Sequence, residues 1–544
     1  MTAVDTPAGT QLSLDSDPPR ILVADPIAGD GVERLRAAGR VDVDTGLSAD
    51  QLLERIAGYD ALVVRSETKV TAEIFERATR LRVVGRAGVG VDNIDIDAAT
   101  RAGVLVLNAP TGNTVAAAEH AVALMCALAR NVAPADASMK AGRWDRKLFM
   151  GTELRDKTLG LLGLGKIGQE VARAAGQGLL MRVIAHDPLV SPERAEKAGV
   201  TLVDFETLVR ESDVLSVHVP LTEQTRGCIG AAQLAAMKPG ARVLNVARGG
   251  VIDEAALAQA LRDGSIAGAA VDVFTSEPLP ADNPLVGAPN LLLTPHLGAS
   301  THEAQVNVAF DVADQIVAVL GGGAARYAVN APSIDPAELL ALKPYLELAH
   351  AMGALATQLA GGHLRSVTAT YTGELAVRDS VVLTSEVIRG LLSPYTETRI
   401  NPINAMTVAR THGIEVEVGS TTRRTTVDWA NSILLDVRGE QRIRLAGTQF
   451  EGEPRITAIN GYRTMMAPAG RYLVATNRDR RGVIAAVSGL LSDGGINIAN
   501  IELSRDQPYG RALMLVQTDE AVPEDLLERL RSEAGLESLY AVTL

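Results

Sequence analysis

The stretch TLGLLGLGKIGQEVARAA, residues 158–175, joins a short apolar run, a glycine-rich loop and the start of a helical pattern. Gly163, Gly165 and Gly168 in this stretch have the spacing G-x-G-x-x-G. Glycines so placed let backbone N–H groups approach a pyrophosphate at a helix N-terminus, where the helix dipole favours an anion. A tight turn without a ligand is the alternative. The strand before the loop and the helix after it favour a dinucleotide site in a Rossmann fold.

One acidic residue indicates which dinucleotide this loop takes. Asp187 ends the next apolar run, MRVIAH (residues 181–186), about 20 residues after Gly168, where the ribose hydroxyls would lie. A carboxylate accepts hydrogen bonds from a free ribose diol and repels a 2′-phosphate, and no arginine follows directly. The sequence therefore predicts NAD rather than NADP.

Short apolar runs alternate with helical patterns on both sides of this loop, from ILVAD (residues 21–25) to NLLLT (290–294). Such alternation predicts two doubly wound parallel sheets. The helical segment 302–320 is too short to be a domain, so we expect it to pack back onto the first sheet. From residue 472 the order strand, helix, strand, strand, helix, strand predicts a ferredoxin-like module. The predicted units are a disordered tail (1–19), a discontinuous substrate-binding domain (20–112 and 304–328), an NAD-binding Rossmann domain (113–303), an intervening α+β domain (329–469) and a regulatory domain (470–544).

Composition narrows the classes of function. The chain has 544 residues, 47% of them hydrophobic and 22% charged, which is typical of a globular protein with several domains. A formal net charge of −13 argues against a broad nucleic-acid or acidic-membrane surface. Two cysteines and no signal-peptide pattern predict a cytoplasmic protein without a disulfide framework or a metal site.

Three reactive side chains follow strand ends after the glycine loop: Arg248 in NVARGG, Glu277 in DVFTSEP and His296 in TPHLGAST. Singly, each has an ordinary structural explanation, as a surface arginine, a solvated carboxylate or a core histidine. Together, at the edge where ligands of open α/β sheets bind, they predict an active site. Histidine can take a hydroxyl proton near neutral pH, and a carboxylate orients it and favours its protonated form. Arginine offers a two-pronged donor to a substrate carboxylate.

These motifs, together with GLGKIG, resemble those of the D-isomer-specific 2-hydroxyacid dehydrogenases over roughly residues 20–325. The whole layout is similar to that of the long-form D-3-phosphoglycerate dehydrogenases, with an intervening domain and a C-terminal ACT domain. The resemblance implies a His296 acid/base, its partner Glu277 and the carboxylate anchor Arg248. It implies NAD contacts at Gly163, Gly165, Lys166, Ile167, Gly168, Asp187, Val219, Pro220, Val246, Ala247, Asp272, His296 and Gly298. It implies substrate contacts at Arg65, Ser66, Arg86, Gly88, Asn113 and Arg248, with Lys69 nearby and Arg146 reaching the neighbouring subunit's site.

The last segment carries the regulatory part of this resemblance. In ATNRDRRGVIAAVSGLLSDGGINIAN, the family's effector positions map to Asp479 and Asn497, which implies L-serine as an effector. The sequence departs from the family pattern D-R-P-G, because Arg481 stands where proline is usual, and from the usual aromatic or histidine at Asn477. A purely structural dimerisation module is the alternative.

The function expected from all this is NAD-dependent oxidation of D-3-phosphoglycerate by a homo-oligomer, a dimer or a tetramer, in L-serine biosynthesis. Another D-2-hydroxyacid dehydrogenase, acting on glycerate/hydroxypyruvate or 2-hydroxyglutarate, is the alternative within enzymes. A non-catalytic NADH-sensing scaffold is the alternative outside them, because fold alone does not decide function.

Overall fold

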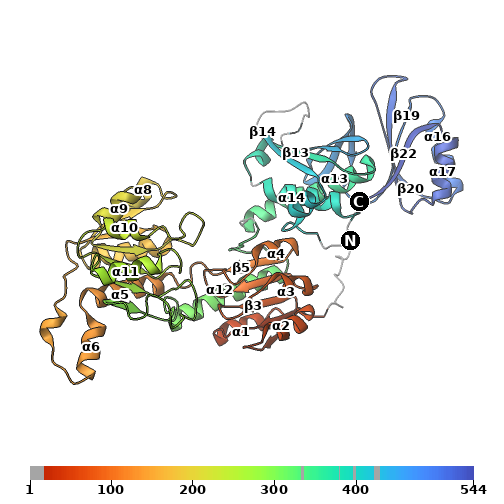
Figure 1. The fold of residues 1–544 in the computed structure, drawn as a ribbon. Coiled ribbons are helices and arrows are strands. Elements are labelled where there is room, and N and C mark those ends of the chain that lie inside the picture. The colour runs from red at the N-terminus through yellow and green to blue at the C-terminus, as the bar shows by residue number, and fades with distance from the viewer. Residues whose placement is uncertain (1–16, 332–335, 379, 396–399, 422–428, 430) are drawn as a thin grey trace, which may run out of the picture.

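The computed structural model describes residues 17–331, 336–378, 380–395, 400–421, 429 and 431–544. Most of the predicted tail, residues 1–16, lies outside this range. Four β-sheets follow one another along the chain (Figure 1). They comprise two parallel sheets, one mixed sheet and one antiparallel sheet, and the predicted fold class is confirmed. The domain boundaries given above stay predictions.

The first sheet has five parallel strands in the order β2-β1-β3-β4-β5. Helix α12 (His302–Leu320), from far along the chain, packs back onto it, and its Val312 and Ile316 join the core formed by Ile21 and Val83. A Cβ atom on Gly85 would lie only 2.5 Å from Val312 Cγ1, so this close approach requires glycine. The other elements are β1 (Arg20–Val23), α1 (Gly29–Arg36), β2 (Arg40–Val43), α2 (Ala49–Arg55), η1 (Ile56–Gly58), β3 (Ala61–Val64), α3 (Ala72–Arg77), β4 (Val83–Arg86), α4 (Ile96–Arg101) and β5 (Leu105–Asn108).

The second sheet has seven parallel strands in the order β12-β11-β10-β9-β6-β7-β8. The strand order reverses between β6 and β9, so a crevice forms beside the glycine loop, as in other open α/β sheets. The elements are α5 (Thr114–Ala129), β6 (Thr158–Leu162), α7 (Lys166–Arg173), η3 (Ala174–Gly178), β7 (Arg182–His186), α8 (Pro192–Lys197), β8 (Thr201–Leu202), α9 (Phe205–Glu211), β9 (Val214–Val217), α10 (Ala231–Ala236), β10 (Arg242–Asn245), α11 (Glu254–Asp263), β11 (Gly268–Val271) and β12 (Leu291–Leu293).

An arm extends from this unit between α5 and β6 (Figure 1). It contains α6 (Val132–Lys140) and the short helix η2 (Arg146–Phe149). Trp144, Leu148 and Met150 on the arm are 79%, 75% and 83% exposed. Large apolar side chains exposed together are typical of an interaction surface.

The third sheet is mixed, in the order β14-β13-β15-β16-β17-β18, and packs against α13 (Pro336–Ala360). Its elements are β13 (Ser366–Thr372), η4 (Gly373–Val377), α14 (Ser380–Leu392), α15 (Ala405–Thr411), β14 (Glu415–Thr421), β15 (Ser432–Arg438), β16 (Arg442–Phe450), β17 (Glu453–Ile459) and β18 (Tyr462–Met466). Asn401 Nδ2 donates to the carbonyl of Gly103 (2.6 Å) and so joins this unit to the first sheet.

The fourth sheet is antiparallel, in the order β20-β21-β19-β22, with two helices on one face. Its elements, β19 (Arg471–Arg478), α16 (Val483–Asp493), β20 (Ile498–Arg505), β21 (Arg511–Thr518), α17 (Glu524–Glu533) and β22 (Leu536–Thr543), have the predicted ferredoxin-like order. Within the described ranges, no single helix is both long and apolar enough to cross a membrane; the bent pair α5 and α6 passes that test by length and composition alone.

Candidate active site

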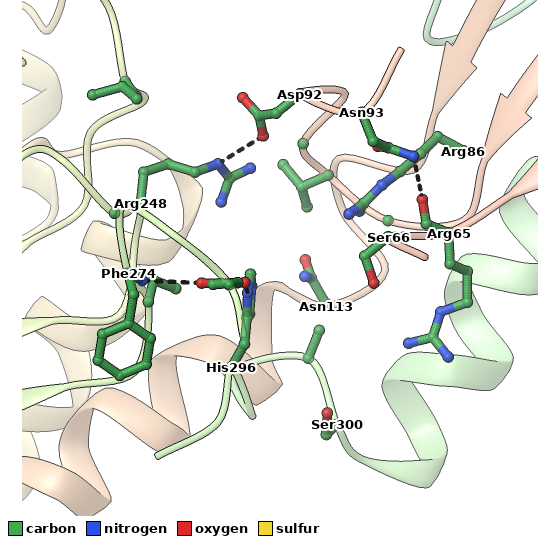
Figure 2. A pocket seen from close by; sticks show the side chains of 18 of the residues that line it. Arg65, Ser66, Arg86, Asp92, Asn93, Asn113, Arg248, Phe274, His296 and Ser300 are labelled. Atoms are coloured by element: carbon green, nitrogen blue, oxygen red, sulfur yellow. Dashed lines mark hydrogen bonds and ion pairs between the residues drawn. The ribbon is translucent and has the colours of Figure 1, made fainter. Parts of the chain in front are cut away.

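The residues predicted to react lie together in a cavity of about 590 Å³ between the first two sheets. Figure 2 shows them converging from both units. Its walls include every predicted catalytic residue and most of the predicted substrate contacts: Arg65, Ser66, Lys69, Arg86, Gly88, Asn113, Arg248, Glu277 and His296.

His296 and Glu277 form a hydrogen-bonded pair. His296 Nδ1 lies 2.8 Å from Glu277 Oε2, and the backbone N–H of Phe274 donates to Glu277 Oε1 at 3.0 Å. Burial opposes ionisation of Glu277, but these two hydrogen bonds outweigh it and hold the pKa of the carboxyl below its usual value. A carboxylate fixed on Nδ1 leaves Nε2 of the imidazole to face the cavity.

The backbone at His296 is held in an unusual conformation. Its φ is +55°, in the left-handed region that residues other than glycine rarely adopt. The backbone N–H of His296 donates to the carbonyl oxygen of Asp272 at 2.9 Å. Strained residues persist only where the surroundings fix them, and they gather at active sites.

The Asp272 side chain fixes the loop that carries His296 through hydrogen bonds. It is fully buried, and its oxygens accept hydrogen bonds from the backbone N–H groups of Leu297 (2.8 Å) and Gly298 (2.9 Å) and from the hydroxyl of Thr294. His120 Nε2, from α5, lies 3.2 Å from the same carboxylate. Asp272 thus anchors the loop that carries His296, and its predicted contact with the cofactor stays a prediction.

Arg248 lies in a turn after β10 that hydrogen bonds to the Asn245 side chain hold in place. Asn245 Oδ1 accepts from the N–H of Ala247 (3.1 Å), and its Nδ2 donates to the carbonyl of Arg248 (2.9 Å). The guanidinium donates from Nη1 to Ala247 (2.7 Å), and its Nε lies 3.3 Å from Asp92 Oδ2 in the other unit (Figure 2). An ion pair therefore spans the cavity between the two sheets.

A cationic cluster lines the opposite wall. Arg86 ends β4, and burial first, then the nearby charges of Arg248 and Arg65, lowers the pKa of its guanidinium to about 10. The Nε of Arg86 is buried and has no hydrogen-bond partner in the described part of the chain. The buried carboxylate of Asp25 fixes the Arg65 loop by accepting from the backbone N–H groups of Arg65 (2.6 Å) and Thr68 (3.1 Å). Several unbalanced cations around one cavity suit an anionic ligand.

The glycine loop between β6 and α7 has the shape that a dinucleotide requires. Gly163 has φ +97°, and a Cβ atom there would lie 2.6 Å from the carbonyl oxygen of His218. A Cβ atom on Gly168 would collide with the carbonyl of Gly163, whereas one on Gly165 would meet nothing within 4 Å. Gly163 and Gly168 are therefore needed for close packing of the backbone. Open space remains at Gly165, where the phosphates would lie. These residues fit an NAD pyrophosphate.

The other predicted cofactor contacts sit at the carboxyl ends of the same strands. Asp187 follows β7, and its carboxylate accepts from the N–H groups of Leu164 (2.8 Å) in the glycine loop and Leu189 (2.9 Å). Lys166 instead lies with its Nζ 5.5 Å from the ring centre of Tyr327. The remaining predicted positions follow β6, β9, β10 and β12, and they are Ile167, Val219, Pro220, Val246, Ala247 and Gly298.

Three of the predicted substrate and effector residues lie away from the cavity. Arg146 is exposed on the arm. Asp479 follows β19, where it accepts from Arg505 Nη1 (2.7 Å), and Asn497 precedes β20, where its Nδ2 donates to Asp519 (2.5 Å). Because β19 and β20 both run antiparallel to β21, Asp479 and Asn497 stand at opposite ends of the sheet. One chain does not bring these two side chains together.

Sequence reasoning did not single out Asp92, Asp25 or His120 as parts of this site. Asp92 stands in the stretch VVGRAGVGVDNID next to Asn93, whose Nδ2 donates to the carbonyls of Arg65 (2.7 Å) and Thr68 (2.6 Å). The sequence did contain a signal for Asp92: it stands two residues after Gly90, in a loop already predicted to contact the substrate. Throughout the described ranges, no group of three or more His, Cys, Asp or Glu side chains is arranged to hold a metal ion.

Three family models match the chain. Residues 122–298 match the NAD binding domain of D-isomer specific 2-hydroxyacid dehydrogenases. Residues 341–460 match the D-3-phosphoglycerate dehydrogenase intervening domain, and residues 471–535 match the ACT domain. The predicted cofactor, NAD, is thereby supported independently of the loop geometry.

Relatives and solved structures agree with these matches. The D-3-phosphoglycerate dehydrogenase of Archaeoglobus fulgidus is 44% identical, over 95% of this chain and 98% of its own length. That of Bacillus subtilis is 38% identical, over 96% of this chain and 99% of its own length. A glyoxylate reductase from Paecilomyes thermophila is similar in structure (TM-score 0.53, 30% identity), covering 57% of this chain and 98% of its own. An NAD-dependent formate dehydrogenase from Staphylococcus aureus in complex with NAD is also similar in structure (TM-score 0.50, 28% identity), covering 56% of this chain and 96% of its own. The chain belongs to the D-3-phosphoglycerate dehydrogenase family.

Proposed function

We propose that this protein oxidises D-3-phosphoglycerate to 3-phosphohydroxypyruvate with NAD, the first committed step of L-serine biosynthesis. The observation that carries the proposal is one cavity that holds both the His296–Glu277 pair and the arginines of two facing sheets. An acid/base pair alone would suit many 2-hydroxy acids. The added cations on the opposite wall favour a substrate with a negative group at each end.

In this proposal His296 is the base. NAD, which the glycine loop and Asp187 would hold, would supply the acceptor for the hydride on the C2 carbon of the substrate. The hydroxyl proton on C2 passes to Nε2 of His296, so the alcohol becomes a ketone and the imidazole becomes a cation. Glu277, held on Nδ1 at 2.8 Å, stabilises that cation and fixes the ring plane.

The two ends of the substrate go to different walls. Arg248 binds the carboxylate at C1, because its turn places the guanidinium beside the His296 pair. The phosphate goes to Arg86 and Arg65, with Ser66, Gly88 and Lys69 along the same wall. Asn113 also lines the cavity, and its buried Oδ1 has no hydrogen-bond partner among the described residues, which supports a contact with the substrate. Binding at two ends would hold the C2 carbon of the substrate in one orientation beside His296.

Preference for NAD over NADP rests on Asp187. Its carboxylate is fixed at the end of β7 by two backbone N–H groups, and Pro188 and Leu189 follow it. A 2′-phosphate on the ribose would meet this fixed negative charge without a compensating arginine.

We further propose a homo-oligomer whose contact includes the arm, since Trp144, Leu148 and Met150 are exposed there. In that assembly Arg146 reaches the neighbouring subunit's cavity. A serine effector that touches both Asp479 and Asn497 would have to lie between two chains, because they occupy opposite ends of the sheet. A cytoplasmic location agrees with two free cysteines.

The proposal is tested by incubating the purified protein with NAD and D-3-phosphoglycerate and identifying the product by mass spectrometry. We expect NADH and 3-phosphohydroxypyruvate in equal amounts. Tight NADH binding without conversion of any 2-hydroxy acid would instead support the sensing scaffold.

A further inference from the structure

A second cavity, of about 510 Å³, lies far from the active site, where the intervening unit meets the ACT unit. Its walls come from α13, α14, the linker Pro468–Ala469 and the end of β22. Gln358 on α13 exchanges two hydrogen bonds of 3.0 Å with the backbone of Thr543, which joins the two units beside the cavity. This volume is large enough for a small metabolite.

Two glycines bring polar side chains together at this junction. A Cβ atom on Gly353 of α13 would collide with the carbonyl of Val387, and one on Gly390 of α14 would collide with the carbonyl of His350. The helix backbones therefore touch. Because the helices are this close, His350, from one helix, faces Glu386, from the other.

The polar atoms of this group do not satisfy one another. Arg389 Nη2 pairs with Glu386 Oε2 at 2.9 Å, but Arg389 Nε is buried and has no hydrogen-bond partner among the described residues. His350 Nδ1 is likewise buried with no partner in the described part of the chain, and it lies 3.9 Å from Glu386 Oε2, too far for a hydrogen bond. The group is therefore not fully paired internally, and the exposed parts of the His350 and Arg389 side chains border the cavity.

The charges indicate the chemistry of that group. Two carboxylates, Glu347 and Glu386, line the cavity with one guanidinium, Arg389. Burial raises the pKa of Glu386, and burial together with Arg389 lowers the pKa of His350, so the imidazole adds no positive charge near neutral pH. The cavity is lined by one more carboxyl group than guanidinium, which favours a cation, and the exposed part of the Arg389 guanidinium can bind an anion.

We propose that this cavity binds a small zwitterion of the amino-acid type. Its ammonium group lies against Glu386 and Glu347, and its carboxylate lies against the exposed part of the Arg389 guanidinium. The site is separate from the effector positions Asp479 and Asn497, and it does not depend on the reaction proposed above. A ligand held here contacts both units at their junction, so it would stabilise their docked arrangement.

The test is calorimetric titration of the full-length protein with L-alanine and L-serine. Ethylamine and propionate, which each carry only one of alanine's charges, are the ligand controls. Two variants test the site: Glu386→Gln removes the proposed ammonium partner, and Ala354→Leu fills the cavity while leaving the ion pair intact. Arg410→Gln, at an exposed position of α15, is the matched control, and Asn497→Ala removes the predicted effector position of the ACT unit.

We expect saturable binding of at least one of the two amino acids and binding of ethylamine and propionate weaker by about tenfold or more. Both cavity variants should weaken L-alanine binding by about tenfold or more, and Arg410→Gln and Asn497→Ala should leave it unchanged. L-serine binding that is lost in Asn497→Ala belongs to the effector position of the ACT unit, so L-serine is scored for the cavity only in the Asn497→Ala protein. The proposal is overturned if neither amino acid binds that protein at millimolar concentration, if ethylamine or propionate binds it as tightly as the amino acid does, or if amino-acid binding to it survives Ala354→Leu.

Discussion

Replacing Arg86 should have opposite effects on substrate recognition and on the stability of the fold. The Arg86 guanidinium is largely buried beside two other arginines, and that burial is the main reason why its pKa, about 10, lies below the usual value for arginine. A difference of this size corresponds to about 3 kcal/mol of unfavourable environment for the cation in the ligand-free protein. We attribute that cost to a site prepared for an anion.

Arg86→Met keeps the length of the side chain and removes its charge. Without ligand, the free energy of unfolding should rise, by at most about 3 kcal/mol, and the apparent midpoint of thermal unfolding should rise with it. Loss of a charge-assisted contact worth about 1.5–3 kcal/mol should lower kcat/KM for D-3-phosphoglycerate roughly 10- to 150-fold. The value for D-glycerate, which has no phosphate, should change little.

Steady-state kinetics on both substrates and thermal unfolding without ligand measure these effects. Arg77→Met, at an exposed position on α3 of the same unit, is the matched control and should change neither property. An equal loss of kcat/KM on both substrates, together with a lower midpoint of unfolding, would refute the reasoning, because Arg86 would then be a structural residue.

Four further predictions concern the other parts of the site. His296→Asn should abolish nearly all turnover while NADH binding, followed by fluorescence, stays unchanged; retained turnover would exclude His296 as the base. Glu277→Gln should lower kcat by about tenfold or more and move the acid limb of the pH–rate profile to lower pH, since the imidazolium loses its counter-charge. The lowered pKa of Glu277 keeps its carboxylate charged in the unmodified protein down to that limb, and an unchanged profile in the variant would contradict this. Asp187→Ala should narrow the preference for NAD over NADP, measured as the ratio of kcat/KM values, and an unaltered ratio would assign the preference elsewhere. Asp92→Asn should lower KM for D-3-phosphoglycerate, because it removes a carboxylate that competes for Arg248 at 3.3 Å; a higher KM would mean that Asp92 positions the guanidinium instead.

The regular elements of the fold were predictable because apolar spacing is a local signal. The helical segment predicted at 302–320 coincides with the bounds of α12. Alternating strands and helices likewise indicated both parallel sheets. The glycine loop was recognisable because its geometry needs residues without a Cβ atom at fixed positions.

Partners that are distant in sequence were not predictable in the same way. Nothing local to Arg248 shows that Asp92, from another sheet, pairs with it. Asp272 shows the same limit: the family resemblance implied a contact with the cofactor, which stays a prediction, and did not reveal that the carboxylate holds the His296 loop. Asp479 and Asn497 belong to the same effector motif in the sequence. They lie at opposite ends of the sheet because Asp479 follows β19, Asn497 precedes β20, and both strands run in the same direction.

The most direct test of the central claim is the initial rate of NADH formation with D-3-phosphoglycerate beside D-glycerate and D-2-hydroxyglutarate. Each is measured with and without L-serine. The account predicts a kcat/KM for the phosphorylated acid that exceeds the others by about tenfold or more. D-glycerate has no second anionic group for Arg86, and the second carboxylate of D-2-hydroxyglutarate carries less charge than a phosphate. Equal rates on all three acids, or a preference for an unphosphorylated one, would contradict it.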